Sequence, residues 1–249
     1  MSLTVALLGL GEAGSRLAAD LAEAGVEVRG YDPVVEGGVA DPAEAVAGAD
    51  VVLSVNSAQA ALGAARSALP ALGANSLYAD LNTAAPALKR ELGELVGERF
   101  ADVALLGPIP ERGLRGPVLA SGPGAQRFAD AFAPLGMPVE VVSARSGDAA
   151  AMKLVRSVFM KGLGASVVES LEAAQAAGHA EWLEEEIAAV IGRPLLDRLV
   201  EGSRKHAARR VDEMEAARDL LLELGVEPRI ASASAELLAE LVVPVSDTT

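Results

Sequence analysis

The sequence predicts an α/β fold with a doubly wound, mostly parallel sheet, followed by an all-helical C-terminal domain. Two observations lead to this fold class. Short apolar runs alternate with amphipathic stretches through the first half of the chain, which is the pattern of strand–helix–strand units. From Gly147 onward no strand pattern recurs, and helical stretches follow one another. We therefore expect two domains, residues 1–145 and 146–249.

Seven segments are expected to form strands, because each is a short apolar run rich in Val, Leu or Ala. The first four are each followed by a helical pattern, and right-handed crossovers between parallel strands then give a doubly wound sheet. The segments are residues 4–9, 27–32, 50–55, 76–81, 100–106, 117–122 and 138–143.

The second half of the chain is expected to begin with one long helix that starts at Gly147 and stops at Gly178. Glycine and proline then separate the helical patterns that follow. Further helices are expected at roughly 179–191, 194–201, 203–224 and 229–242.

The composition excludes several classes of function. The chain has 249 residues, of which 51% are hydrophobic, and its net charge is −14. Because that charge repels phosphate backbones and anionic lipids, we expect no nucleic-acid partner and no membrane contact. No apolar run reaches the roughly 18 residues of a membrane span, and cysteine is absent. We therefore expect a cytoplasmic protein, and no residue spacing indicates a metal site.

The segment GLGEAG (residues 9–14) has the spacing G-x-G-x-x-G between an expected strand and an expected helix. In this context the first glycine permits a tight turn, the second lets the backbone approach a pyrophosphate, and the third lets the helix pack closely. The sequence therefore predicts a Rossmann-type dinucleotide-binding domain, although a plain strand–helix turn remains an alternative. The expected cofactor contacts in this loop are Gly9, Leu10, Gly11, Glu12, Ala13 and Gly14.

The cofactor is expected to be NAD or NADP, with NAD favoured. Asp32 follows the second strand, about 20 residues past the loop, where a carboxylate accepts the ribose hydroxyls of NAD and repels a 2′-phosphate. The alternative for Asp32 is a turn residue before Pro33. Val55 and Asn56 follow the third strand and are expected to border the nicotinamide or its ribose.

Lys153 interrupts a small, apolar helical stretch, GDAAAMKLVRS (147–157), in a chain with 21 lysines and arginines of which only four are lysines. An amine can exchange a proton near neutral pH if its surroundings lower its pKa, whereas a guanidinium stays charged. One interpretation of Lys153 is therefore a general acid/base. The alternative is a surface lysine whose stem lies along the helix.

With these residues, the chain resembles the β-hydroxyacid dehydrogenase superfamily, which includes 6-phosphogluconate dehydrogenase. DLNTAAP (80–86), DVALLGP (102–108) and GDAAAMKLVRS resemble its substrate segments and lysine helix. The resemblance implies transfer of a hydride between a nicotinamide cofactor and a small, anionic hydroxyacid or its carbonyl, with Lys153 as the acid/base. It also implies a homodimer formed through the C-terminal domain.

Several positions depart from the family pattern and resemble a divergent, mostly uncharacterised branch. Asn82 and Leu106 stand where serine is usual, and Arg156 and Ser157 stand where asparagine is usual. The resemblance implies that these four positions belong to the groups that hold the substrate. The resemblance implies substrate contacts from Asn82, Thr83, Gly107, Arg156 and Ser157.

Two alternatives to a hydroxyacid dehydrogenase stay open: an imine or unusual carbonyl reductase on the same scaffold, and a dinucleotide-sensing protein without turnover. A basic cluster that includes His206, Arg209 and Arg210 is either a substrate grip or a solvated helix face. Lys89 and Lys161 are expected to be surface charges.

Overall fold

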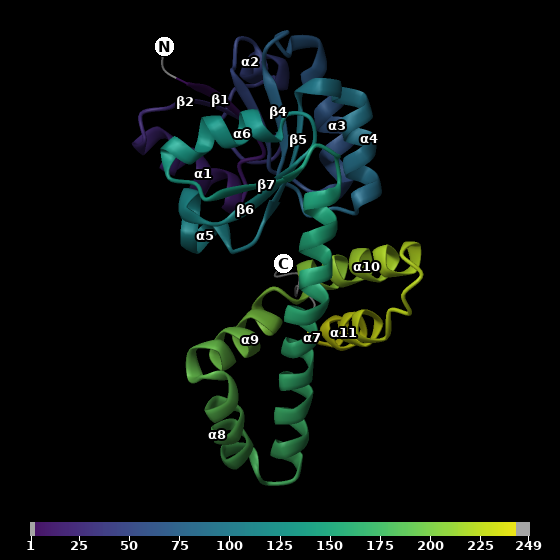
Figure 1. Cartoon of the computed structure of the whole chain (residues 1–249). Coiled ribbons are helices and arrows are strands. Elements are labelled where there is room, and N and C mark those ends of the chain that lie inside the picture. Colours follow the sequence, from purple (N-terminus) through teal and green to yellow (C-terminus); the bar gives the residue numbers. More distant parts are fainter. Residues whose placement is uncertain (1–2, 243–249) are drawn as a thin grey trace, which may run out of the picture. The chain divides into compact units, whose positions relative to one another are not determined.

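The computed structural model describes residues 3–242 and divides into two compact units (Figure 1). One unit reaches to Lys153 and the other starts at Leu154. The division lies inside helix α7 (Asp148–Ala176), whereas the expected boundary preceded this helix. The first turn of α7 is part of the N-terminal unit because Ala149 packs against Ala104 and Leu119 of the sheet.

The N-terminal unit is built on a seven-stranded sheet with the order β2-β1-β3-β4-β5-β6-β7. All neighbouring strands are parallel except β5 and β6, which are antiparallel. Each of the seven expected strands forms, so the doubly wound, mostly parallel sheet is confirmed. The strands are β1 (Thr4–Leu8), β2 (Glu27–Tyr31), β3 (Val51–Ser54), β4 (Leu77–Asp80), β5 (Phe100–Leu105), β6 (Val118–Ser121) and β7 (Val139–Ser143).

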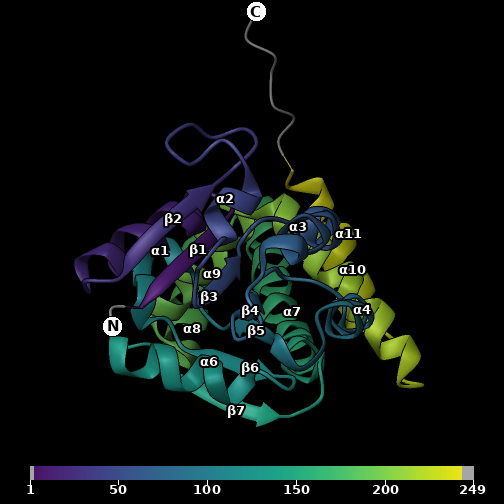
Figure 2. The same ribbon diagram turned by 90° about the horizontal axis from the view of Figure 1, so that it is seen from above.

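Helices cover both faces of this sheet, as the alternation of strand side chains requires. Leu7 and Leu53 point into one core, together with residues of α1 and α6, while Leu8 and Val52 point into another with residues of α2, α3 and α4. Figure 2 shows α3 and α4 on the same side of the strands. The helices are α1 (Glu12–Glu23), α2 (Pro42–Val46), α3 (Ala58–Ala68), α4 (Pro86–Val96), α5 (Ile109–Arg112) and α6 (Ala125–Phe132), with short 3₁₀ turns at Leu69–Ala71, Gly97–Arg99, Gly113–Arg115 and Ala133–Leu135.

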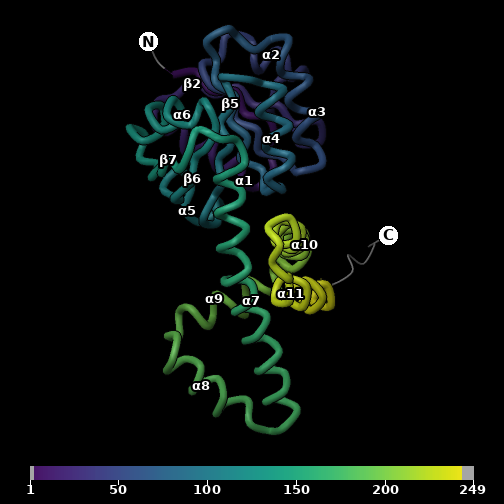
Figure 3. Tube along the Cα trace, turned by 45° about the vertical axis from the view of Figure 1, so that its right-hand side comes forward, coloured from purple at the N-terminus to yellow at the C-terminus, as the bar shows by residue number. Residues whose placement is uncertain are grey.

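The C-terminal unit is entirely helical in the part that the structure describes. From Leu154 onward α7 runs to Ala176, and the chain turns at Gly178 into α8 (Ala180–Ile191). Figure 3 shows α7, α8 and α9 (Arg193–Lys205) following one another, and α10 (Ala207–Glu223) beside α11 (Arg229–Glu240). One small core joins α7 to α9, and another joins α10 to α11.

The break between α9 and α10 differs from the expected one. The sequence predicted helices at 194–201 and 203–224, with Gly202 between them, but α9 continues through Gly202 and the break falls at His206. Gly202 instead leaves room for a guanidinium, because a Cβ there would lie 2.4 Å from Nη2 of Arg210. This glycine therefore permits close packing and does not end a helix.

A search of residues 3–242 finds no helix that is both long enough and apolar enough to cross a membrane.

Candidate functional site

The predicted cofactor residues gather at one edge of the sheet, where the adjacent parallel strands β2, β1, β3 and β4 end. The strands stay in register to their last residues, since Val55 N–H donates to Leu8 O at 2.9 Å and Leu81 N–H to Ser54 O at 2.9 Å. The helices after β1 and β3 lie on opposite faces, so this edge contains the point where the strand order reverses. Open α/β sheets bind ligands in the crevice at such a point.

The surroundings of the three glycines of the loop fit the three roles that the motif predicts. Gly9 has φ +117°, and a Cβ there would lie 2.1 Å from the carbonyl oxygen of Val55. A Cβ at Gly14 would lie 1.9 Å from Gly9 O, so the start of α1 touches the end of β1. A Cβ at Gly11 would have no atom within 4 Å. Protein atoms therefore pack closely against Gly9 and Gly14, whereas the space beside Gly11 is free of protein atoms. This free space fits a pyrophosphate held against the backbone.

The N-terminus of α1 supplies the donors for such a phosphate. Its N-cap is Gly11, which has no side chain to cap the helix. The first backbone N–H groups of a helix have no acceptor within the helix, so the amides of Glu12 and Ala13 are suited to an anionic oxygen. The amide of Leu10 is already engaged, because it donates to Asp32 Oδ2 at 2.8 Å.

Asp32 joins the loop to the turn that follows β2. Its Oδ1 accepts hydrogen bonds from Val34 N–H at 2.8 Å and Val35 N–H at 2.9 Å, in addition to the Leu10 contact at Oδ2. Partial burial by itself raises the pKa of Asp32, but the three backbone donors outweigh it and lower the pKa below its usual value. Asp32 is thus an ionised turn residue, and Oδ2 keeps a lone pair that could accept a ribose hydroxyl. Its contact with ribose stays a prediction.

Asn56 and Asn82 form a polar network with Ser54 at the ends of β3 and β4. Asn82 Oδ1 accepts from Asn56 N–H at 2.6 Å, and Asn82 Nδ2 donates to Asp80 Oδ2 at 2.6 Å, Ser54 Oγ at 3.0 Å and Asn56 Oδ1 at 3.0 Å. Asn82 is buried, so its amide already serves protein groups on both sides. In this structure the side chain holds two strand ends together, and the substrate contact expected of it stays a prediction.

Lys153 lies against the segment that follows β4. Its Nζ donates to Thr83 Oγ1 at 2.6 Å, a contact between residues 70 positions apart in the sequence. Gly147 brings the two segments together, since it has φ +96° and a Cβ there would lie 2.8 Å from Pro86 O. The structure thus joins two of the predicted site residues directly.

The other predicted substrate residues lie in different places. Gly107 follows β5, which is parallel to β4, so it belongs to the same edge of the sheet as Thr83. Arg156 and Ser157 belong to the C-terminal unit, where Arg156 is exposed. Ser157 is fully buried, and its hydroxyl donates to Glu213 Oε1. Ser157 therefore links α7 to α10, and its contact with substrate stays a prediction.

The sequence analysis did not predict a buried ionic cluster. The expectation that Lys89 is a surface charge is wrong, because this side chain is 1% exposed. Its Nζ lies 2.5 Å from Asp80 Oδ1, 2.9 Å from Asp80 O and 3.2 Å from Asp102 Oδ1. Burial alone lowers the pKa of Lys89, but the two carboxylates outweigh it and raise the pKa above its usual value. We call Lys89, Asp80 and Asp102 the buried cluster.

Two signals in the sequence point to the buried cluster. Lys89 shares a spacing of three and then four residues with Leu92 and Val96, which are buried, so it lies on the inner stripe of α4. Asp80 ends and Asp102 interrupts an otherwise apolar strand that is covered on both faces. A carboxylate in such a place needs a cation.

Lys161 is also less exposed than expected. Its side chain is 17% exposed, and Nζ lies 3.0 Å from Glu213 Oε1. The expectation of a surface charge is therefore wrong here too, and Lys161 joins Ser157 on the same carboxylate.

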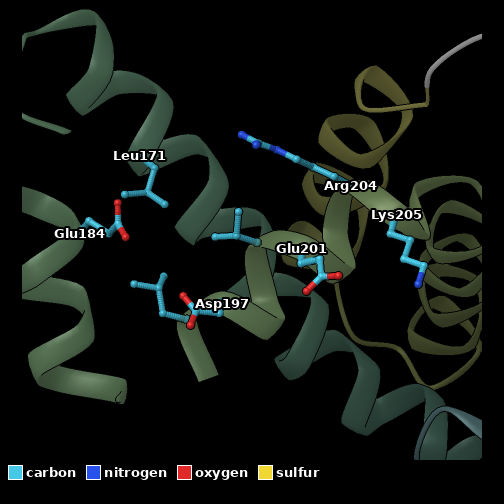
Figure 4. Close-up of a pocket in the computed structure, with 8 residues that line it drawn as sticks. Leu171, Glu184, Asp197, Glu201, Arg204 and Lys205 are labelled. Carbon is cyan, nitrogen blue, oxygen red and sulfur yellow. The ribbon is translucent and has the colours of Figure 1, made fainter. Parts of the chain in front are cut away.

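The basic cluster around residue 206 divides into two environments. Arg210 is half-buried, and its Nη1 donates to Ser203 Oγ at 2.9 Å. Burial has the largest effect on the pKa of Arg210 and lowers that pKa. Arg204 and Lys205 line a pocket of about 650 Å³ in the C-terminal unit (Figure 4). The lining mixes acidic with basic side chains and consists of Leu171, Glu184, Leu196, Asp197, Val200, Glu201, Arg204 and Lys205.

Among residues 3–242, no three His, Cys, Asp or Glu side chains are grouped so that they could hold a metal ion.

Two family models match the chain. Residues 4–106 match the NAD binding domain of 6-phosphogluconate dehydrogenase, and residues 174–241 match a domain of unknown function, DUF1932. The first match covers β1 to β5 and includes the glycine loop, Asp32, Asn56 and Asn82.

One curated relative and one solved structure are similar at about the same level of identity. An uncharacterised 28.5 kDa protein of the 7S RNA 5′ region in Methanothermus fervidus is 27% identical over 156 residues, which are 61% of this chain and 61% of the relative. The chain therefore matches less than two thirds of that relative's length. A conserved hypothetical protein from Sinorhizobium meliloti 1021 is 27% identical, with a TM-score of 0.76 over 100% of this chain and 91% of that one.

Solved enzymes share the fold at lower identity. The 3-hydroxyisobutyrate dehydrogenase of Mycobacterium tuberculosis, solved with L-serine, has a TM-score of 0.80 at 21% identity, covering 96% of this chain and 94% of that one. An imine reductase from Streptomyces aurantiacus has a TM-score of 0.61 at 20% identity, covering 95% and 93%. Both likenesses concern the fold, and the fold alone does not separate these two activities.

Proposed function

We propose that this chain, whose residues 4–106 belong to the family of NAD-binding domains of 6-phosphogluconate dehydrogenase, is an oxidoreductase in which Lys153 is the general acid/base. The resemblance that the sequence indicated is confirmed by this match and by the fold of 3-hydroxyacid dehydrogenases. The observation that carries the proposal is the 2.6 Å contact of Lys153 Nζ with Thr83 Oγ1. This contact lies in the same unit as the nucleotide loop, which supports a role for the Lys153 amine in proton exchange.

The chain's own residues fit a dinucleotide. The open position at Gly11 admits the pyrophosphate, and the first amides of α1 bind its oxygens. The free lone pair of Asp32 Oδ2 accepts a ribose hydroxyl, while its charge repels a 2′-phosphate. NAD is therefore favoured over NADP. When bound, this cofactor supplies or accepts a hydride.

Lys153 completes the reaction by moving a proton. The contact of Nζ with Thr83 Oγ1 fixes the amine beside the segment that follows β4. A substrate oxygen bound at this place would exchange its proton with Nζ. In the reductive direction Nζ gives a proton to the carbonyl oxygen, and in the oxidative direction it takes a proton from the hydroxyl.

We propose a small, anionic hydroxyacid, or its carbonyl, as the substrate. Support comes from the resemblance of residues 80–86, 102–108 and 147–157 to the substrate segments of hydroxyacid dehydrogenases. A protein of net charge −14 needs local donors to hold an anion. Thr83 has a hydroxyl suited to this, and Lys153 carries the positive charge.

The test uses the purified chain with a panel of hydroxyacids, aldehyde acids and cyclic imines, each with NAD(H) and NADP(H). We expect turnover of at least one hydroxyacid or aldehyde acid, with higher kcat/KM for NAD. Lys153→Met should lower kcat by about 10²–10⁴-fold, because general acid–base catalysis contributes that much, while the Kd for cofactor stays near that of the wild type.

A matched control replaces a lysine outside the N-terminal unit. Lys205→Met removes the same amine from α9 and should leave kcat unchanged. A Lys153→Met variant within about threefold of wild-type kcat would remove Lys153 from the mechanism. Turnover of imines alone would replace the hydroxyacid by an imine substrate, and cofactor binding without any turnover would indicate a dinucleotide sensor.

A further inference from the structure

The buried cluster lies between the two segments whose side chains meet at Lys153 and Thr83. Asp80 ends β4, three residues before Thr83, and Asp102 lies in β5. Lys89 in α4 bridges the two carboxylates through contacts of 2.5 Å and 3.2 Å. Because all three side chains are at most 1% exposed, water does not screen these charges.

Asp102 connects the buried cluster to the start of α7 by hydrogen bonds. Asp102 Oδ2 accepts from Ala150 N–H at 3.1 Å and from Ser121 Oγ at 3.0 Å, and Ser121 Oγ accepts from Ala149 N–H at 3.0 Å. Two of the first amides of α7 are thus held by a buried carboxylate and a buried hydroxyl. Ala149 lies four residues before Lys153, on the same helix face, so a shift of this turn would also move Lys153.

Asp80 connects the buried cluster to the segment that contains Thr83. Asp80 Oδ2 accepts from Asn82 Nδ2 at 2.6 Å, and Asn82 is the residue before Thr83. The start of α7 and the segment after β4 are also joined directly, by the 2.6 Å contact of Lys153 Nζ with Thr83 Oγ1. A continuous series of contacts therefore joins the buried cluster to the proposed acid/base, through hydrogen bonds at Asp80 and Asp102 Oδ2 and through the Lys89–Asp102 ion pair.

We propose that the buried cluster is a positioning device that holds Lys153 against Thr83 by fixing the first turn of α7 relative to the segment after β4. The proposal rests on the proposed function only in assigning catalysis to Lys153. A buried ion pair is a poor source of stability, since apolar side chains of similar volume stabilise a core as well or better. Buried polar groups fix a register in some proteins, and we assign that role to the hydrogen bonds of this cluster.

The direct variant is Lys89→Met, which leaves two buried carboxylates without their cation and can prevent folding. Ser121→Ala avoids this risk, because it leaves the three charges in place and removes only the hydroxyl between Asp102 and Ala149 N–H. The matched control is Ser76→Ala, another buried serine of the same unit, whose hydroxyl donates to Ala49 O at 2.6 Å.

The readout is the rate at which acetic anhydride labels each lysine over a range of pH, measured by mass spectrometry on the whole folded chain. The chain has only four lysines, so Lys205 serves as the internal standard. If the Thr83 contact is lost, we expect the relative labelling rate of Lys153 to rise about fivefold, as the loss of one typical hydrogen bond implies, and its pH midpoint to move. Ser76→Ala should change neither.

A second readout is kcat on any substrate that the panel identifies. Ser121→Ala should lower kcat at least tenfold with little change in the KM for cofactor. Wild-type labelling of Lys153 in folded Ser121→Ala would overturn the proposal, whereas altered labelling with unchanged kcat would overturn the catalytic role of Lys153 in the proposed function. If no substrate is found, the proposed function fails by itself, and the labelling still decides whether the cluster positions Lys153.

Discussion

The open position at Gly11 gives a sharp test of the nucleotide site. Gly11→Ala adds one methyl group where no atom lies within 4 Å, at a backbone position with φ −63° and ψ −169° that alanine adopts without strain. In the free protein the methyl group therefore meets nothing. With a dinucleotide bound, it would occupy the space in which the pyrophosphate approaches the backbone.

The expected effect on stability is small. Alanine is a poorer N-cap than glycine by somewhat less than about 1 kcal/mol, but it gains about 0.4–1 kcal/mol by reducing the entropy of the unfolded chain. These terms nearly cancel, so the free energy of unfolding should change by less than about 0.5 kcal/mol. Gly14→Ala should behave differently, because its Cβ would lie 1.9 Å from Gly9 O and overpacking costs about 3 kcal/mol or more.

The expected effect on cofactor affinity is large. Displacing the phosphate from one charged hydrogen bond costs about 1.5–3 kcal/mol, which raises Kd by about 10- to 150-fold. Urea unfolding measures the stability, and titration calorimetry with NADH measures Kd. The matched control is Gly63→Ala in α3, where a Cβ also has no atom within 4 Å. It should gain up to about 1 kcal/mol of stability with unchanged Kd. Wild-type affinity in Gly11→Ala would refute the placement of the pyrophosphate.

Two further predictions concern Asp32 and the C-terminal unit. Because the pKa of Asp32 is lowered in the folded chain, its contribution to stability is present above its unfolded pKa of about 3.9 and is lost as the pH falls through the folded pKa. Urea unfolding from pH 7 to pH 3 should therefore show a smaller loss for Asp32→Ala, and parallel curves would contradict this assignment. We also propose a homodimer, because no residue of α8 is buried within the chain and Trp182 and Val190 are 62% and 84% exposed. Light scattering should give about twice 25.3 kDa, reduced toward the monomer by Val190→Asp, whereas a monomeric wild type would exclude the dimer.

The sequence predicted the sheet well because its strands are apolar on both faces and are separated by helical patterns. Each apolar run had one strong interpretation, and the spacing of Gly9, Gly11 and Gly14 placed the loop at the end of β1. The break near Gly202 was misplaced because a glycine inside a helical pattern has two meanings. It can end a helix, or it can admit a neighbour such as the Arg210 guanidinium, which only the folded chain reveals.

The side chains of the candidate site were harder to predict than its backbone. The positions of Asn82 and Thr83 follow from where β4 ends, but their partners depend on contacts across the sheet. Thr83 meets Lys153 from 70 residues away, and Asn82 meets Ser54 and Asn56 at the end of the neighbouring strand. Lys89 was assigned to the surface by its charge, although its spacing with buried Leu92 placed it on the inner face of α4.

The two lysines of the N-terminal unit illustrate how one side chain takes opposite roles. Lys89 lies between two carboxylates that raise its pKa and keep it charged, so it is unsuited to proton exchange near neutral pH. Lys153 donates to the neutral hydroxyl of Thr83, at the edge of the sheet where the cofactor residues gather. Lys89 also contacts Asp102, whose Oδ2 accepts from Ala150 N–H in the first turn of α7. If the buried cluster positions Lys153 as we propose, the core lysine with the raised pKa helps to place the lysine that exchanges the proton.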